Sequence, residues 1–284
     1  MLASFSKVMP ILHGRKLCLP GIDIAGGQAD FLLGALRAFE AARCPALLLV
    51  WAPGADLLDI EASADLVSFH AARSSVPVIL HLDHGREERQ VERAIEAGFK
   101  SVMFDGSACS LEDNARRTKA MAALAHAAGA TIEGELGRLG RAADGDEAAG
   151  ELTDPDEAAW FAAETGIDIL APAVGNAHGF TPQPPRLRFD LIEQIAARTR
   201  LPLSLHGGTG IRLADVRKAA DLGVRKVNVA SQIRRDFNDA LSGAAAKHPG
   251  REFHWKKALQ AGRSAVADRT TQYIRQLRTE GLVE

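Results

Sequence analysis

The feature that most constrains this chain is a regular alternation between short apolar runs and longer segments with helical spacing. Several runs are apolar almost throughout, as strands covered on both faces must be. Eight runs predict strands, at Leu17–Ile24, Ala46–Trp51, Val76–Asp83, Ser101–Asp105, Thr131–Leu136, Asp168–Gly175, Leu201–Gly207 and Lys226–Ala230. Eight strand–helix repeats in a chain of 284 residues predict an α/β fold, a closed (β/α)8 TIM barrel.

The segments between the runs carry helix signals. Helical spacing is clearest at Glu87–Ala97, Leu111–Ala128, Pro155–Thr165 and Leu213–Leu222. Glycine often follows such a segment just before the next run, as expected where a helix ends. An open doubly wound sheet is the structural alternative. It calls for a G-x-G-x-x-G turn after the first strand, and the sequence from residue 25 reads AGGQ instead.

Nothing in the composition divides the chain, so we expect residues 1–284 to form a single barrel domain. The stretch from about 231 to 284 is helical and longer than one barrel helix. It predicts extra C-terminal helices that extend from the barrel. The polar, glycine-bearing stretch Arg138–Gly150 predicts a loop.

Charge and composition indicate which classes of partner and which cellular compartment to expect. A formal net charge of −2 gives no reason to expect a nucleic-acid or membrane-surface partner. No apolar run approaches the roughly 18 residues of a membrane-spanning helix, and the N-terminus does not resemble a signal peptide. The three cysteines, Cys18, Cys44 and Cys109, form no disulfide framework. We therefore expect a cytoplasmic protein.

Three histidines stand out because each follows an apolar run and precedes a glycine: His84, His178 and His206. A single histidine in that position is more often a hydrogen-bonded structural residue. Barrel active sites, however, lie at the C-terminal ends of the strands, and three neutral imidazoles with an open fourth position are typical of catalytic Zn²⁺. Three such histidines favour a metal site.

Other polar residues share these strand ends. His81 lies deeper in its strand by alternation, so we interpret it as a hydrogen-bonded core residue. Asp83 is either an acceptor that orients a histidine or a general acid–base. Asp105 and Glu135 either cap helices and pair with basic side chains, or bind a second cation, monovalent or divalent; the residues leave both alternatives open. A glycine-rich turn at 207–210 and the segment Asn228–Ser231 follow the last two strands, where barrels commonly bind phosphate.

Six segments together resemble the class II (zinc-dependent) fructose-bisphosphate and tagatose-bisphosphate aldolase family. They occur in the family's order and spacing over roughly residues 10–240. The segments are LHLDHG (80–85), SVMFDGS (101–107), IEGELGRLG (132–140), GNAHG (175–179), LHGGTGI (205–211) and GVRKVNVAS (223–231).

The resemblance implies residue roles. It implies that one catalytic Zn²⁺ is bound by His84, His178 and His206, and that Asp83 moves the proton at the substrate's C4 hydroxyl. Asp105 and Glu135 match a second cation site. Dihydroxyacetone phosphate would be held at Gly179, Gly207, Gly208, Thr209, Asn228 and Ser231. The reaction of that family, which the resemblance implies here, is reversible retro-aldol cleavage, in which zinc acts as a Lewis acid without a Schiff-base lysine.

The chain also departs from the family. The first strand ends in Ile22-Asp23 where the family has phenylalanine-asparagine, which adds a negative charge. After Gly140, the place of the family's catalytic glutamate holds Ala143. Near the C-terminus, an aspartate-proline-arginine motif that binds the far phosphate is replaced by FHWK at 253–256. The residue after Asn228-Val229 is Ala230, as in tagatose-type members of the family, whereas fructose-type members have aspartate there.

Acidic residues near Ala143 could substitute for the glutamate: Asp144, Asp146 and Glu147. Arg251 or Arg263 could replace the missing phosphate-binding arginine. We accordingly expect an aldolase that cleaves a ketose 1-phosphate or ketose 1,6-bisphosphate, assembled as a homodimer or homotetramer. Two alternatives stay open: an aldolase with an unphosphorylated acceptor aldehyde, and a non-catalytic sugar-phosphate-binding paralogue. The retained Asp83 argues against the second.

Overall fold

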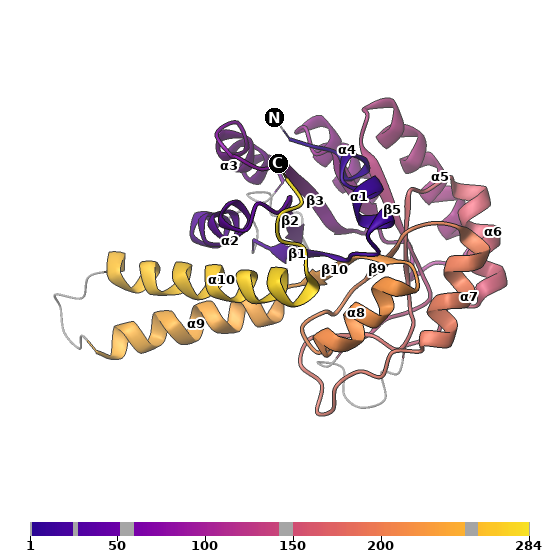
Figure 1. Ribbon diagram of the computed structural model, residues 1–284. Helices are drawn as coiled ribbons and strands as arrows, with labels where there is room; N and C mark the ends of the chain where they lie inside the picture. Colours follow the sequence, from indigo (N-terminus) through magenta and orange to yellow (C-terminus); the bar gives the residue numbers. More distant parts are fainter. Residues whose placement is uncertain (1, 25–27, 52–59, 142–149, 248–254, 284) are drawn as a thin grey trace.

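The computed structural model describes residues 2–24, 28–51, 60–141, 150–247 and 255–283. Within these ranges, eight parallel strands close into a barrel in the order β1-β10-β9-β7-β5-β4-β3-β2 (Figure 1). The barrel strands are β1 (Leu19–Asp23), β2 (Ala46–Trp51), β3 (Val78–Gly85), β4 (Ser101–Phe104), β5 (Thr131–Leu136), β7 (Ile169–Pro172), β9 (Leu203–Leu205) and β10 (Val224–Val229). The predicted (β/α)8 barrel is confirmed.

Helices cover the outside of the barrel. They are the 3-10 turn η1 (Phe5–Lys7) and the helices α1 (Met9–Gly14), α2 (Ala29–Ala41), α3 (Glu61–Ala71), α4 (Glu88–Glu96), α5 (Leu111–Ala127), α6 (Pro155–Thr165), α7 (Phe189–Thr199), α8 (Leu213–Asp221), α9 (Ser231–Ala246) and α10 (Trp255–Leu277). Local signals explain where they begin. The Asp154 side chain accepts the Asp156 and Glu157 N–H groups at the start of α6, and Ser110 caps α5.

The extra C-terminal helices are present. In Figure 1, α9 and α10 form a hairpin that extends beyond the barrel wall. The returning helix α10 also packs along α2. Small residues allow this contact: a Cβ atom at Gly34 of α2 would lie 2.6 Å from the Arg263 carbonyl oxygen of α10. Glycine is therefore required at the crossing of these two helices.

A small parallel sheet adds to the barrel and corrects one expectation. β6 (Gly140–Arg141) pairs with β8 (Ala177–His178). The sixth barrel strand, β7, already ends at Pro172, so His178 does not terminate a barrel strand. It lies instead in β8, within the connection that follows β7. Long-range pairing of two short loop segments leaves no periodic signal in the sequence. The predicted strand Asp168–Gly175 is therefore longer than β7, which ends at Pro172.

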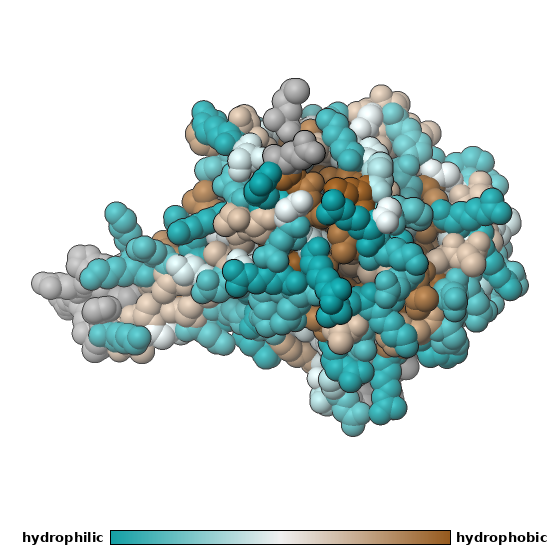
Figure 2. All heavy atoms as spheres, in the orientation of Figure 1, coloured by the Kyte–Doolittle hydropathy of each residue, from teal (hydrophilic) through white to brown (hydrophobic). Residues whose placement is uncertain are grey.

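The visible surface is dominated by hydrophilic residues, with apolar ones showing mainly between them (Figure 2). No helix in the described ranges is both long and apolar enough to cross a bilayer. The barrel interior combines an apolar core with a set of fully buried polar side chains at the strand ends. These buried polar groups make up the candidate site.

Candidate active site

The three histidines singled out in the sequence converge at one point. His84 comes from β3, His178 from β8, and His206 from the residue directly after β9. Their ligating nitrogens all lie within 4.8 Å of one another. His84 and His206 are buried, whereas His178 is half-buried. The arrangement is a histidine cluster with one accessible side.

A β-bulge brings His84 into this cluster. The register between β3 and β4 shifts by one residue between Leu82 and Gly85, and His84 has a left-handed backbone with φ of 54°. Neighbouring side chains of a regular strand point to opposite faces. The bulge breaks that alternation, so Asp83 and His84 both reach His206. Bulges often re-aim a side chain beside an active site.

Two buried carboxylates determine which imidazole nitrogens are available. His84 Nδ1 lies 2.8 Å from Asp105 Oδ2, and His206 Nε2 lies 2.7 Å from Glu133 Oε1. An ionised carboxylate can only accept hydrogen bonds, so both of these nitrogens carry the proton. The remaining nitrogens, His84 Nε2 and His206 Nδ1, face each other at 2.9 Å.

Two facing lone pairs repel, so this geometry requires a proton or a cation between them. Burial opposes protonation of His84, but the carboxylates of Glu135, Asp105 and Asp83 raise its pKa to about 9. Burial, together with the His84 and His206 charges, lowers the pKa of His178 to about 3. Metal ions bind deprotonated ligands and displace such a proton. The donor set therefore fits a divalent metal.

Asp83 lies beside the cluster. Its Oδ1 accepts a hydrogen bond from Asn228 Nδ2 at 2.7 Å and lies 3.8 Å from His206 Nδ1. Burial opposes ionisation, yet the neighbouring imidazoles of His84 and His206 lower the pKa of Asp83. Asn228 Oδ1 is buried and has no hydrogen-bond partner among the described residues. The pair thus offers an ionised base and a free acceptor.

Asp105 and Glu135 form a second cluster with His84, with ligand atoms within 4.8 Å of one another. Asp105 also accepts a hydrogen bond from Ser107 Oγ at 2.6 Å and lies 3.5 Å from Arg86 Nε. Burial and the adjacent Asp105 charge, against the pull of His84, raise the pKa of Glu135 to about 8. Carboxylates held this close either share a proton or bind a cation.

The glycine-rich loop after β9 packs tightly on its neighbours. Gly207 has φ of 69°, and a Cβ there would lie 2.0 Å from the Ala177 carbonyl oxygen. The Gly208 N–H donates to the Asn228 carbonyl oxygen at 2.9 Å, so it is engaged within the protein. Only glycine fits at either position.

The other residues expected to hold phosphate lie around this loop. Thr209 Oγ1 accepts the Gln232 N–H at 3.1 Å, which joins the loop to the first turn of α9, where Ser231 begins the helix. Gly179, directly after His178, has φ of 84°. Thr209 therefore lies beside the N-terminus of α9, and a Cβ at Gly210 would lie 3.5 Å from the Gly179 carbonyl oxygen, so these loops meet near a helix N-terminus.

Three relevant residues were missed in the sequence. Glu133 and Lys226 are fully buried inside the barrel, two positions before Glu135 and Asn228 respectively, and strand alternation could have revealed them. Arg234 was missed because only tertiary structure brings it to Asp23: its Nη2 lies 3.7 Å from Asp23 Oδ2. Asp23 is buried, and its charge is offset by this arginine.

Several expectations fall outside the described residues. These are Ala143, Asp144, Asp146, Glu147, Arg251, Phe253 and His254. Of the remaining departures, Ile22 is buried in the core and Ala230 precedes α9 as its N-cap.

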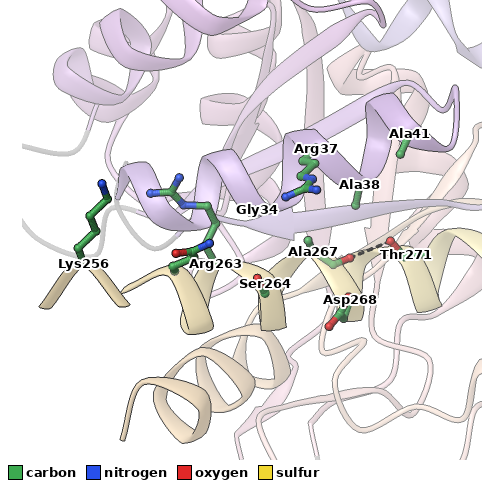
Figure 3. A pocket seen from close by; sticks show the side chains of 11 residues that line it. Gly34, Arg37, Ala38, Ala41, Lys256, Arg263, Ser264, Ala267, Asp268 and Thr271 are labelled. Carbon is green, nitrogen blue, oxygen red and sulfur yellow. Dashed lines mark hydrogen bonds between the residues drawn. The ribbon is translucent and has the colours of Figure 1, made fainter. Parts of the chain in front are cut away.

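A separate groove of about 510 Å³ lies between α2 and α10. Figure 3 shows Arg263 of α10 between Lys256 on the same helix and Arg37 on α2. Arg263 is already paired with Asp30 at 2.6 Å. Among the described residues, only these two helices line the groove, so we interpret it as a helix-packing seam and not as part of the histidine cluster.

Comparison with known protein families gives an extended match. The family described as Fructose-bisphosphate aldolase class-II matches residues 16–282. The sulfofructosephosphate aldolase of Alkalicoccus urumqiensis is 38% identical over 251 residues, which cover 87% of this chain and 87% of that protein. The D-tagatose-1,6-bisphosphate aldolase subunit GatY of Klebsiella oxytoca is 38% identical over 196 residues, covering 67% and 69% respectively.

A solved structure agrees over the full length. The crystal structure of the YdjI aldolase from Escherichia coli K12 superposes with a TM-score of 0.86 at 29% sequence identity, covering 100% of both chains. The agreement extends through the barrel and the C-terminal helices.

Proposed function

This chain belongs to the class II fructose-bisphosphate aldolase family, and from that membership we propose that it is a zinc-dependent aldolase. It would reversibly cleave a ketose 1-phosphate or ketose 1,6-bisphosphate into dihydroxyacetone phosphate and an aldehyde. One observation carries the proposal: His84 Nε2 and His206 Nδ1 face each other at 2.9 Å, with His178 in the same cluster.

The residues that would hold the metal are His84, His178 and His206, and a zinc ion bound by them supplies Lewis-acid polarisation of a substrate carbonyl. Asp105 and Glu135 hold His84 from behind and would bind a second monovalent or divalent cation when both are ionised. The hydrogen bond between His84 Nδ1 and Asp105 is of the type that fixes the ring orientation of a ligand histidine.

Asp83 would move the proton at the substrate's C4 hydroxyl. The hydrogen bond from Asn228 Nδ2 holds the carboxylate beside the cluster, and its lowered pKa keeps it ionised and ready to accept a proton. In the synthetic direction the same group returns the proton to the incoming aldehyde oxygen. Proton transfer by a positioned side chain needs this fixed geometry.

The substrate phosphate would lie at the loops that follow β8, β9 and β10. Backbone N–H groups at a helix N-terminus bind phosphate well, and α9 begins at Ser231. The residues we propose for this contact are Gly179, Gly207, Gly208, Thr209, Asn228 and Ser231. Because the Gly208 N–H is engaged, Gly208 would contribute close approach rather than a donor.

The distal end of the substrate is the least constrained part. The names of the two relatives share a phosphorylated ketose, which carries a sulfo group in one and a second phosphate in the other. Here Asp23 with Arg234 stands at the end of β1, and Lys256 lines the α2–α10 groove. We propose that the distal phosphate is dispensable.

A non-catalytic sugar-phosphate-binding paralogue, or an aldolase for an unphosphorylated acceptor aldehyde, are the competing proposals. The buried, ionised Asp83 favours an enzyme over a binder. We also propose that residues 1–284 form one barrel domain that assembles as a homodimer or homotetramer.

The test is a cleavage screen on zinc-loaded protein over phosphorylated ketoses, with dihydroxyacetone phosphate as the measured product. We expect about one zinc per chain, loss of cleavage on chelation, and recovery when zinc is returned. Borohydride added with substrate should trap nothing. Tight metal binding without any cleavage would favour the binding paralogue, whereas borohydride trapping would replace the zinc mechanism with a lysine Schiff base.

A further inference from the structure

Below the candidate active site, the barrel interior holds a polar layer where barrels are usually filled by bulky branched apolar side chains. Residues two apart in a strand share a face, so each member of this layer lies one step deeper than a site residue. The site residues are Asp83, Glu135, His206 and Asn228, and the corresponding members of the polar layer are His81, Glu133, Ser204 and Lys226. All four members are completely buried.

Lys226 is the centre of the polar layer. Its ammonium lies 2.7 Å from Glu133 Oε2, 3.1 Å from His81 Nε2 and 3.5 Å from Ser204 Oγ. Each of its three donors therefore has an acceptor. A lysine enclosed in this way cannot form a Schiff base with substrate. Its charge therefore acts on the groups that surround it in the barrel.

Glu133 connects the polar layer to the histidine cluster. One of its oxygens accepts from Lys226, and the other accepts from His206 Nε2 at 2.7 Å. With its proton held on Nε2, His206 turns Nδ1 toward His84 Nε2. Without a fixed acceptor at Nε2, the proton could move to Nδ1, which would remove the lone pair a metal needs.

Resting on the proposed function, in which His206 is a metal ligand, we propose that Glu133 and Lys226 are positioning residues for that ligand. Lys226 fixes the Glu133 carboxylate, and Glu133 holds His206 with Nδ1 directed at the metal. Neither residue touches the substrate. The alternative is a purely structural ion pair. Buried ion pairs can often be replaced by apolar residues without loss of stability, so stability and metal binding can be measured apart.

Three variants separate these roles. Glu133→Met/Lys226→Met removes both charges at similar side-chain length and leaves His206 Nε2 without an acceptor. Glu133→Gln/Lys226→Met also removes both charges but keeps a carbonyl acceptor for that N–H. Ser204→Ala is the matched control, because it removes only the longest of the Lys226 contacts, at 3.5 Å, and leaves the hydrogen bonds from Lys226 and His206 to Glu133 in place. Zinc affinity would be measured by competition with a chromophoric chelator, and folding by thermal unfolding.

We expect the double methionine variant to fold and to bind zinc about 10–100-fold more weakly, the range seen when the partner of a ligand histidine is removed. The glutamine–methionine variant should recover most of that affinity, and Ser204→Ala should match wild type. After substitution with Co²⁺, the visible absorption of the double methionine variant should differ from wild type, because the cobalt bands report ligand geometry.

Wild-type zinc affinity and an unchanged cobalt spectrum in the double methionine variant would overturn the proposal. If the double methionine variant does not fold, the zinc affinity of Glu133→Asp tests the proposal instead. It keeps a charge partner for Lys226 but is one methylene too short to reach Lys226 and His206 together, so unchanged affinity there also overturns it. A wild-type protein without bound zinc would instead refute the proposed function itself.

Discussion

At the scale of single residues, the three histidines are not equivalent. His84 presents Nε2 and His206 presents Nδ1, each determined by a different buried carboxylate, whereas the ring of His178 is half-buried. Each of the three histidines is placed by a different part of the chain.

The first prediction concerns these ligands. Single changes His84→Ala, His178→Ala and His206→Ala should each reduce bound zinc below stoichiometric levels and abolish cleavage, because two protein ligands do not hold a catalytic zinc. Metal analysis of the purified protein and a dihydroxyacetone phosphate assay check this. His13→Ala, at an exposed position on α1, is the control and should behave as wild type. Full metal content and activity in all three variants would refute the assignment.

The second prediction concerns Asp83. Asp83→Ala should retain zinc and bind dihydroxyacetone phosphate but lose about 10²–10⁴-fold in kcat, the usual contribution of a general acid–base. Asp83→Asn keeps the side-chain shape and an oxygen facing Asn228, and should be equally slow because it cannot accept the proton. A loss of less than about tenfold in both variants would leave Asp83 with an orienting role only.

At the scale of elements, the α9–α10 hairpin depends on close helix contacts. A Cβ at Gly262 of α10 would lie 2.6 Å from Phe237 Cε2, and the Phe237 ring stacks on Phe31 of α2 with centroids 4.4 Å apart. One glycine thus lets α10 approach the aromatic pair that joins the hairpin to the barrel helices.

The third prediction uses two glycines of this hairpin. Gly262→Ala should destabilise the protein by about 1–3 kcal/mol, as overpacking usually does. At Gly243 of α9, a Cβ would meet no atom of the described chain within 4 Å, so Gly243→Ala should stabilise by up to about 1 kcal/mol through helix propensity. Urea unfolding of the two variants measures both changes. Equal effects would mean that the hairpin is not packed through Gly262.

The fourth prediction concerns pH and the contact between α4 and α5. Glu88 Oε1 and Oε2 accept hydrogen bonds from Arg117 at 2.6 and 2.7 Å. These bonds lower the pKa of Glu88 from 4.5 to about 2. Because the folded value lies below the unfolded one, the ion pair stabilises the protein above pH 4.5 and loses that contribution as the pH falls toward 2.

Glu88→Gln should therefore lower the free energy of unfolding by a constant amount between pH 7 and 5, and by a shrinking amount below pH 4.5. Denaturant unfolding at several pH values measures the difference from wild type. Glu92→Gln, at an exposed position of the same helix, provides the control and should show little effect. A difference that grows on acidification would contradict the ion-pair account.

At the scale of the whole molecule, substrate choice depends on which elements surround the barrel mouth. An arginine fork suits a distal phosphate because it bonds two oxygens at once. Lys256 cannot do this, and it lines the α2–α10 groove. Arg263 is paired with Asp30. Arg234 is near the strand ends, but Asp23 opposes its charge.

The fifth prediction is that a ketose 1-phosphate is cleaved with a kcat/KM at least comparable to that of fructose or tagatose 1,6-bisphosphate. Both substrates should be measured on one zinc-loaded preparation. Asp23→Asn, which removes the carboxylate charge facing Arg234, should shift the ratio toward the bisphosphate. A preference of a hundredfold or more for a bisphosphate in the wild type would refute the prediction, since that ratio is about 2.7 kcal/mol of transition-state binding.

Much of this protein could be read from local sequence. Apolar runs of strand length, separated by helical spacing, gave the eight strands and closed barrel, and α6 begins and ends at the predicted residues Pro155 and Thr165. Strand alternation correctly assigned His81 to the core, where its Nδ1 lies 2.8 Å from Ser101 Oγ. Periodicity and helix capping are short-range properties, so a sequence contains them in full.

The contacts between residues far apart in the sequence are determined only by closure of the barrel. His84 and His206 are 122 residues apart, and Lys226 and Glu133 are 93 apart. Which nitrogen of a histidine is free depends on such distant partners. The bulge at His84 and the pairing of β6 with β8 likewise leave no periodic signal. A sequence specifies which residues face inward, but partners inside a barrel are fixed only when all eight strands meet, because burial then favours arrangements in which most polar groups have a hydrogen-bond partner.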